Sequence, residues 1–146
     1  MLHLNITLGA VALATSCFAS TDSETGRVVG IIRIGDDGPT IEAPDTVRVN
    51  ADFGAVVNTF GSSTCTTPDG VTLTLGPAEA RVVPYDEETT GGDGACTADL
   101  APRPHPVVLR FTQPGAARIV VAGSVIHEES RERAPGEATK TVVVVP

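Results

Sequence analysis

The sequence predicts an all-β domain in which two sheets pack into a sandwich, and three observations lead to this expectation. Short runs of β-branched residues recur between turn residues, and several of these runs alternate apolar and hydroxyl side chains with a period of two. No window of about eleven residues shows the apolar periodicity of an amphipathic helix. The 146 residues, less a leader, leave room for one domain with a single core.

Eight runs account for the predicted strands. In chain order they are RVVGIIRI, TVRVN, GAVVNTF, VTLTL, ARVVPY, PVVLRF, ARIVVAGSVI and TKTVVVV. Turn residues separate them, in the segments DDGP, TPDG, LGP, TGGDG and QPG. In VTLTL the alternation places Val71, Leu73 and Leu75 on one face of the sheet and the threonines on the other.

This pattern resembles the bacterial immunoglobulin-like class of β-sandwich domains, above all in TQPGAARIVVAGS followed by TKTVVVV, which is similar to the last hairpin of such a domain. The resemblance implies an antiparallel sandwich of about seven or eight strands over residues 27–146. The core tryptophan of antibody domains is absent, and Ala116 or Ala117 stands where many relatives have a corner tyrosine. The class includes adhesins, spacers and binding modules, so the fold alone does not select a function.

The N-terminal residues have the features of a signal peptide. The apolar run Ile6–Ala14 suits the central region of a signal peptide and is too short for a helix that crosses about 30 Å of hydrocarbon. The preceding segment, MLHLN, lacks the usual Lys or Arg. We predict a signal peptide over residues 1–16 and therefore export.

Residues 13–17, LATSC, resemble the lipobox of bacterial lipoproteins. Thr15, Ser16 and Cys17 match that pattern, whereas Ala14 stands where leucine is usual. The resemblance implies a lipid on Cys17, which becomes the mature N-terminus, followed by a flexible polar tether over residues 17–26. Two alternatives stay open, namely ordinary cleavage after Ala19 and an uncleaved leader.

Two cysteines remain once Cys17 is set aside. Cys65 and Cys96 form an even pair, which in an oxidising compartment predicts a disulfide that closes a loop of about 32 residues. Neither cysteine belongs to a C-x-x-C motif, and His105 and His127 are isolated in the sequence. We therefore predict a disulfide rather than a metal site, and no cofactor.

Charge and motifs argue against two classes of function. The net charge of −8 and the absence of a basic cluster exclude a partner with a phosphate backbone, so no nucleic acid is expected. HEESR begins like the zinc-protease motif H-E-x-x-H, but Arg131 replaces the second histidine. No serine lies in a G-x-S-x-G motif, and we expect a protein that is not an enzyme.

Weaker candidates lie in the predicted turns and loops. Acidic residues that could converge on Ca²⁺ are Asp36, Asp37, Asp86, Glu87, Glu88, Asp93, Glu128 and Glu129. His105, within PRPHP, is predicted to be a solvated loop residue. Tyr85 is the one aromatic placed like a binding residue, although ordinary packing is the favoured interpretation. Residues 127–137 are predicted to form an exposed hairpin loop.

Two functional hypotheses follow. The first is a structural or protein-interaction module of the cell envelope, at the outer membrane or cell surface, with the membrane as partner through the lipid and a further protein as possible partner. The alternative is a small-ligand, carbohydrate or metal-binding sandwich, soluble in the periplasm or secreted. Few aromatic residues are available to line a ligand site, which favours the first hypothesis.

Overall fold

The structure, a computed structural model, describes residues 23–35, 40–92, 94–127 and 130–146 and confirms the all-β expectation. Its nine strands are β1 (Glu24–Val29), β2 (Ile41–Glu42), β3 (Thr46–Arg48), β4 (Phe53–Gly61), β5 (Thr66–Leu75), β6 (Glu79–Thr90), β7 (Ala101–Leu109), β8 (Gly115–Ile126) and β9 (Arg133–Val145). Each of the eight predicted runs overlaps a strand, and the ninth strand, β2, is too short to show a period in the sequence. No helix able to cross a membrane occurs within the described ranges.

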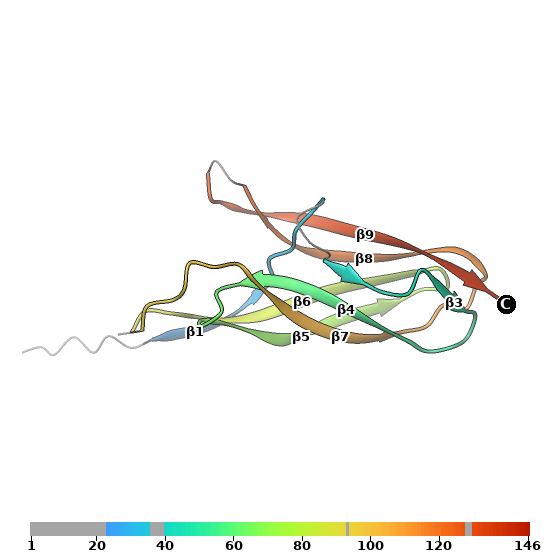
Figure 1. Ribbon diagram of the computed structural model, residues 1–146, viewed down its shortest axis with the longest axis horizontal. Coiled ribbons are helices and arrows are strands. Elements are labelled where there is room, and N and C mark those ends of the chain that lie inside the picture. Colours follow the sequence, from blue (N-terminus) through green and yellow to red (C-terminus); the bar gives the residue numbers. More distant parts are fainter. Residues whose placement is uncertain (1–22, 36–39, 93, 128–129) are drawn as a thin grey trace, which may run out of the picture.

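The strands form two sheets that pack face to face (Figure 1). One sheet has six strands, in the order β1-β6-β8-β9-β3 with β5 on β6, and the other has three, in the order β2-β4-β7. Apolar side chains from both inner faces form one core. Its largest fully buried apolar members are Ile32, Val57, Val82, Leu109, Phe111, Ile119, Val121 and Val142.

Two strand pairs are parallel, which corrects the expectation of an antiparallel sandwich. β3 runs parallel to β9, and β6 runs parallel to β8 over Glu79–Val82 and Arg118–Val121. The reason for the second pair is the path of the chain. After β6 the chain crosses to the other sheet as β7 and then returns, so β8 starts from the same end of the sandwich as β6.

The N-terminal strand begins inside the stretch predicted to be a flexible tether. β1 includes Glu24, Thr25 and Gly26, which pair antiparallel with β6. These side chains are exposed on both faces of the strand, so no apolar period marks it in the sequence. Backbone pairing with β6 therefore orders a segment whose composition indicates a linker, and the folded domain starts at Glu24 rather than Arg27. The signal peptide and Cys17 lie outside the described residues.

Beyond β1 the chain bends at Gly30 and enters the space between β6 and β8. The Gly30 N–H donates to the Pro84 carbonyl at 2.9 Å, and the Ser124 N–H donates to the Gly30 carbonyl at 2.9 Å. A Cβ atom on Gly30 would lie 2.3 Å from Thr59 Cγ2 and 2.9 Å from Asp86 Oδ2. The close approach of this backbone to its neighbours therefore requires glycine.

Gly30→Ala is expected to lower the free energy of unfolding by about 1–3 kcal/mol, because the added methyl group overpacks a closed site. Gly26→Ala is the matched control, since a Cβ there would meet no atom within 4 Å. Chemical unfolding of both variants measures the difference. Equal stability of the two variants would contradict the crowding at Gly30.

β7 is an edge strand whose open side is lined by prolines. The Asn58 N–H donates to the Thr40 carbonyl, so the backbone hydrogen-bonding groups of Asn58 point away from β7. Pro104 is the β7 partner of Asn58, and its backbone therefore points away from β4. Pro102 and Pro106 share this orientation, because they lie two residues away on either side. All three positions would aim an N–H at the free edge, and proline removes it. The strand therefore resists pairing with another chain at this edge.

Candidate functional site

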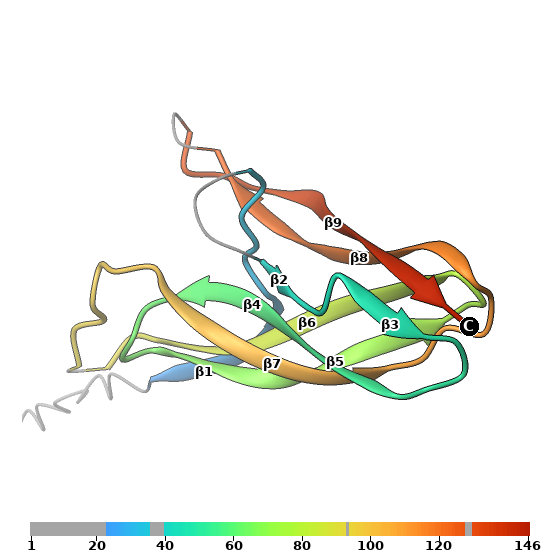
Figure 2. The ribbon, with the colours of Figure 1, turned by 45° about the vertical axis from the view of Figure 1, so that its right-hand side comes forward.

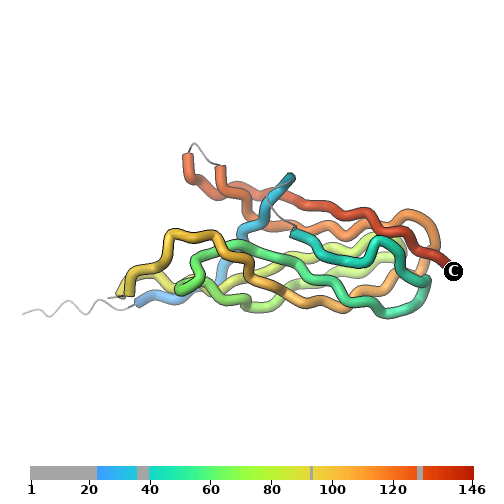
Figure 3. The backbone as a smooth tube through the Cα atoms, viewed as in Figure 1, coloured from blue at the N-terminus to red at the C-terminus, as the bar shows by residue number. Residues whose placement is uncertain are grey.

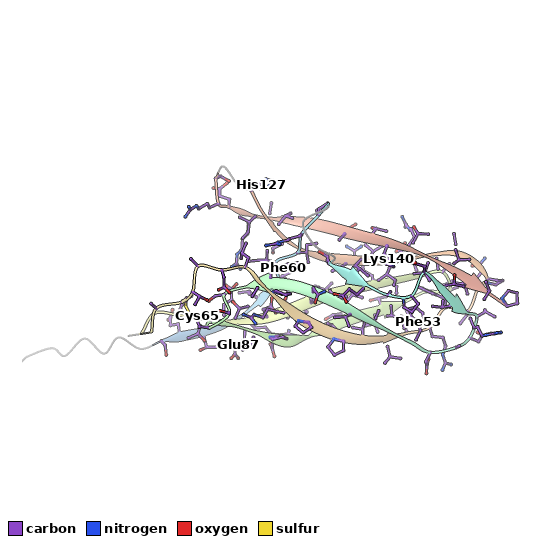
Figure 4. The ribbon with its side chains drawn as sticks, viewed as in Figure 1. Phe53, Phe60, Cys65, Glu87, His127 and Lys140 are labelled. Carbon is purple, nitrogen blue, oxygen red and sulfur yellow. A yellow bond between two sulfur atoms is a disulfide. The ribbon has the colours of Figure 1, made fainter. Side chains whose placement is uncertain are left out.

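The predicted disulfide between Cys65 and Cys96 is present. Cys65 lies between β4 and β5, Cys96 lies between β6 and β7, and their Cα atoms are 5.5 Å apart. Figure 4 places Cys65 at the end of the sandwich where β1 begins. The Thr89 N–H donates to the Cys65 carbonyl at 2.9 Å. The bond therefore ties the β6–β7 connection to the β4–β5 turn and to the end of β6.

Hydroxyl and carboxylate groups support the disulfide. The Thr97 N–H donates to Thr64 Oγ1 at 3.0 Å, and Ser62 Oγ lies 2.9 Å from Thr97 Oγ1. Asp99 Oδ1 accepts from the Ser63 N–H at 3.0 Å and from the Ser63 hydroxyl at 3.2 Å. The hydrogen bond from the Ser63 N–H is the largest cause of the lowering of the Asp99 pKa to about 2. The stabilisation from Asp99 is therefore complete at neutral pH and is lost as the pH falls through about 2.

An apolar groove of about 510 Å³ lies at the same end, between the β8–β9 hairpin and the segment that follows β1. The side chains that line it are Ile31, Ile32, Arg33, Ile34, Leu100, Val125 and Ile126. Ile34 is 55% exposed and Leu100 is 44% exposed, which is high for residues of this size. Such a surface can bury an apolar group of a partner or ligand. The sequence did not indicate the groove, because Ile34 belongs to a run predicted to be a strand and Leu100 lies in a connection without periodicity.

A second hollow of about 290 Å³ continues from the groove toward the disulfide and shares Ile31, Leu100 and Ile126 with it. Arg133 of β9 donates to Glu88 Oε1 of β6 at 2.6 Å, and both residues line this hollow. The ion pair connects the base of the β8–β9 hairpin to the body of the six-stranded sheet. The groove is therefore lined by aliphatic side chains together with Arg33, and the Arg133–Glu88 ion pair lies at the border of the adjoining hollow.

A buried polar cluster joins the two sheets, and it shows that the prediction of a solvated His105 was wrong. Thr59 of β4 and His105 of β7 belong to the three-stranded sheet, and Asp86 of β6 belongs to the six-stranded sheet. Their exposed fractions are 0%, 3% and 1%. His105 alternates with Val107 and Leu109, which are also buried. This period of two was the signal in the sequence that could have placed His105 in the core.

Three atoms of this Thr59–Asp86–His105 cluster lie within hydrogen-bond distance of one another. The Thr59 hydroxyl donates to Asp86 Oδ1 at 3.0 Å, and His105 Nε2 lies 3.1 Å from both Asp86 Oδ1 and Thr59 Oγ1. Because a carboxylate only accepts hydrogen bonds, Nε2 of His105 carries a proton in this arrangement. In a hydrolase triad the nucleophile and the carboxylate contact opposite ring nitrogens, whereas here both contact Nε2. The cluster therefore suits a structural link between the sheets.

Tyr85 packs against a cation. The Arg27 guanidinium lies 3.8 Å from the centre of the Tyr85 ring, and Arg27 Nε donates to Asp69 Oδ2 at 2.6 Å. One face of the ring is thereby covered, and the charge of the covering side chain is balanced. This arrangement agrees with the simpler expectation that Tyr85 packs within the sheet.

His127 lies at the tip of the β8–β9 hairpin (Figure 4). The His127 N–H donates to the Glu132 carbonyl at 3.1 Å, which closes the turn. The exposed turn is shorter than predicted, because β9 already begins at Arg133 and pairs Pro135 with Ser124. Residues 133–137, predicted to belong to the loop, are therefore part of a strand, and deleting residues 130–135 would disrupt it.

Among the described residues, no group of three or more His, Cys, Asp or Glu side chains is arranged to hold a metal ion. Several of the acidic residues considered for Ca²⁺ lie outside those residues, namely Asp36, Asp37, Asp93, Glu128 and Glu129. No family model, curated protein or solved structure matches the chain. The features of this chain that bear on its function are therefore the disulfide, the groove and the sheet edges.

Proposed function

We propose that the protein is an exported module of the cell envelope, held to the membrane by a lipid on Cys17, that acts as a structural or protein-interaction domain. The observation that carries the proposal is the Cys65–Cys96 disulfide, because such bonds form and persist outside the cytosol. The leader-like run and the lipobox-like residues support the same conclusion. The C-terminal β8–β9 hairpin supports placing the sandwich in the bacterial immunoglobulin-like class.

The point at which the described chain begins determines the orientation of such an anchored domain. Ser23 Cβ would lie 3.2 Å from a Cβ atom on Gly92, near the disulfide, whereas Pro146 lies at the opposite end of the long axis (Figure 3). The segment from Cys17 to Ser23 spans at most about 20 Å. The disulfide end and the apolar groove therefore face the membrane, where a neighbouring envelope protein could bury Ile34 and Leu100. The Pro146 end faces away from it.

Cys17→Ser is expected to abolish partitioning into detergent and to cause accumulation of unprocessed precursor, because the serine hydroxyl cannot replace the thiol that is acylated before cleavage. Phase partitioning and intact-mass measurement of the protein test this. Ser20→Ala is the control, since it alters the segment but leaves the acceptor cysteine. Normal cleavage after Ala19 with release of a soluble variant, as in the parent, would refute the anchor.

The second candidate function is a soluble ligand-binding sandwich of the periplasm or the medium, and the groove favours it. Its volume of about 510 Å³ falls within the usual range for small-molecule sites. Its isoleucine, leucine and valine side chains, with Arg33 beside them, suit a ligand that has an apolar part and a polar part better than a carbohydrate, which usually stacks on aromatic rings. Under this alternative the parent protein is found in the soluble fraction, so the fractionation of the parent separates the two candidates.

A further inference from the structure

The edges of the two sheets differ in how they are protected against pairing with another chain. Open backbone N–H and C=O groups at an edge can accept a foreign strand, and proteins block them with charges, prolines or short strands. Such residues on the described edge strands are Glu24, Arg27, Glu42, Arg48, Pro68, Asp69, Pro102, Arg103, Pro104, Pro106, Arg133, Pro135, Glu137 and Lys140. Val71–Leu75 of β5 carries neither a charge nor a proline, although it is also an edge.

The backbone of Val71–Leu75 is open on one side. β5 pairs with β6 alone among the described strands. The Pro84 carbonyl accepts a hydrogen bond from the Gly30 N–H, so this carbonyl points away from β5. Val71 is the β5 partner of Pro84, and its N–H and C=O groups therefore point away from β6. Leu73 and Leu75 share this orientation because they follow at intervals of two. Three residues therefore direct N–H and C=O groups at the free edge.

The side chains along this edge leave it accessible. Thr72 and Thr74 are exposed on the outer face, and Leu75 is 49% exposed. β7 lies along the same long side of the sandwich, as Figure 2 shows, and its prolines offer no N–H groups there. An incoming strand on this side would therefore find open hydrogen-bonding groups on β5.

We propose that Val71–Leu75 pairs antiparallel with the same segment of a second copy, across a twofold axis at Leu73. In this register Val71 lies opposite the second copy's Leu75, and Thr72 lies opposite the second copy's Thr74. The contact joins apolar residues on the inner face and threonines on the outer face, both favourable cross-strand pairs. An antiparallel edge contact is self-complementary, as a twofold dimer requires. The absence of charge allows the two identical edges to approach.

The test is the monomer–dimer equilibrium of the full chain with its natural N-terminus, measured by sedimentation velocity over a range of protein concentrations. Detergent, if the protein needs it, is the same for every variant. Thr72→Lys/Thr74→Lys places lysine opposite lysine twice and is expected to raise the dimer dissociation constant about tenfold. Thr72→Lys/Thr74→Glu places lysine opposite glutamate in this register and is expected to restore dimerisation at low salt.

Thr139→Lys/Thr141→Lys is the matched control. Both threonines are exposed on β9, and Thr141 lies opposite Arg118 as Thr74 lies opposite Arg81. This variant makes the same change in charge away from the proposed contact, and its dissociation constant is expected to equal that of the parent.

A parent that stays monomeric at all concentrations would overturn the proposal, as would a lysine pair on β5 with no effect. If Thr72→Lys/Thr74→Glu dissociates as readily as Thr72→Lys/Thr74→Lys, the proposed pairing of Thr72 with the second copy's Thr74 is wrong. Because the measurement does not depend on Cys17, its outcome is independent of the anchor.

Discussion

His105→Leu is expected to lower the free energy of unfolding by about 3 kcal/mol. The substitution removes the imidazole that donates to Asp86 Oδ1 at 3.1 Å and leaves a carboxylate that is 1% exposed with fewer partners. A buried carboxylate that loses one of its hydrogen-bond donors is costly, because no water reaches it to replace the lost interaction. Unfolding in guanidinium chloride, followed by circular dichroism, measures the change.

Two further variants identify the origin of this loss. Asp86→Asn added to His105→Leu is expected to regain at least about 1 kcal/mol, because asparagine keeps the shape of the side chain without its charge. His127→Leu is the surface control, since His127 is exposed at the hairpin tip, and its effect is expected to stay within about 0.5 kcal/mol. If the single and double variants at the cluster were equally unstable, the charge of Asp86 would not be the cause.

Replacing Cys65 and Cys96 together with serine is expected to lower the free energy of unfolding by roughly 3.5–4 kcal/mol, mainly because the unfolded chain regains the freedom of the closed loop. The two residues are separated by 31 positions in the sequence, so the loop is long enough for a large effect. The same unfolding experiment applies. Treatment of the parent with a reducing agent is expected to reproduce the loss.

Cys17→Ser serves as the matched cysteine control for this experiment, because it replaces the third cysteine of the chain without touching the pair. Its free energy of unfolding is expected to equal that of the parent. A double serine variant as stable as the parent would contradict the stabilising role of the disulfide. If Cys17→Ser lowers the free energy of unfolding by the same amount, the effect comes from replacing a cysteine and not from losing the disulfide.

The sequence predicted most of the strands because burial on one face leaves a period of two. Val107 and Leu109 show it in β7, and Val142 and Val144 show it in β9. The prediction was wrong where a strand has no buried face, as in Glu24–Gly26, whose order comes from backbone pairing with β6. TPDG was expected to be a turn but forms an irregularity within β5, where Gly70 adopts a φ of 79°.

The candidate sites also differ in how far they could be predicted from the sequence. The pairing of Cys65 with Cys96 follows from parity once Cys17 is set aside as the lipid-anchored N-terminus. The contact of Asp86 with His105 depends on how two strands from different sheets face each other, and local sequence does not contain that information. Likewise, the groove brings Ile34, Leu100 and Ile126 together from three separate parts of the chain.

The position of the disulfide also determines how far the chain can lengthen under mechanical load. Ser23 and Pro146 lie at opposite ends of the long axis, so a pull between them acts along the strands. In a fully stretched chain, residues 65–96 would span about 100–110 Å. With the bond intact, this segment contributes only the 5.5 Å between the Cα atoms of Cys65 and Cys96. A domain pulled between these two ends would therefore yield a shorter extension while oxidised, and reduction would release the remaining length of chain.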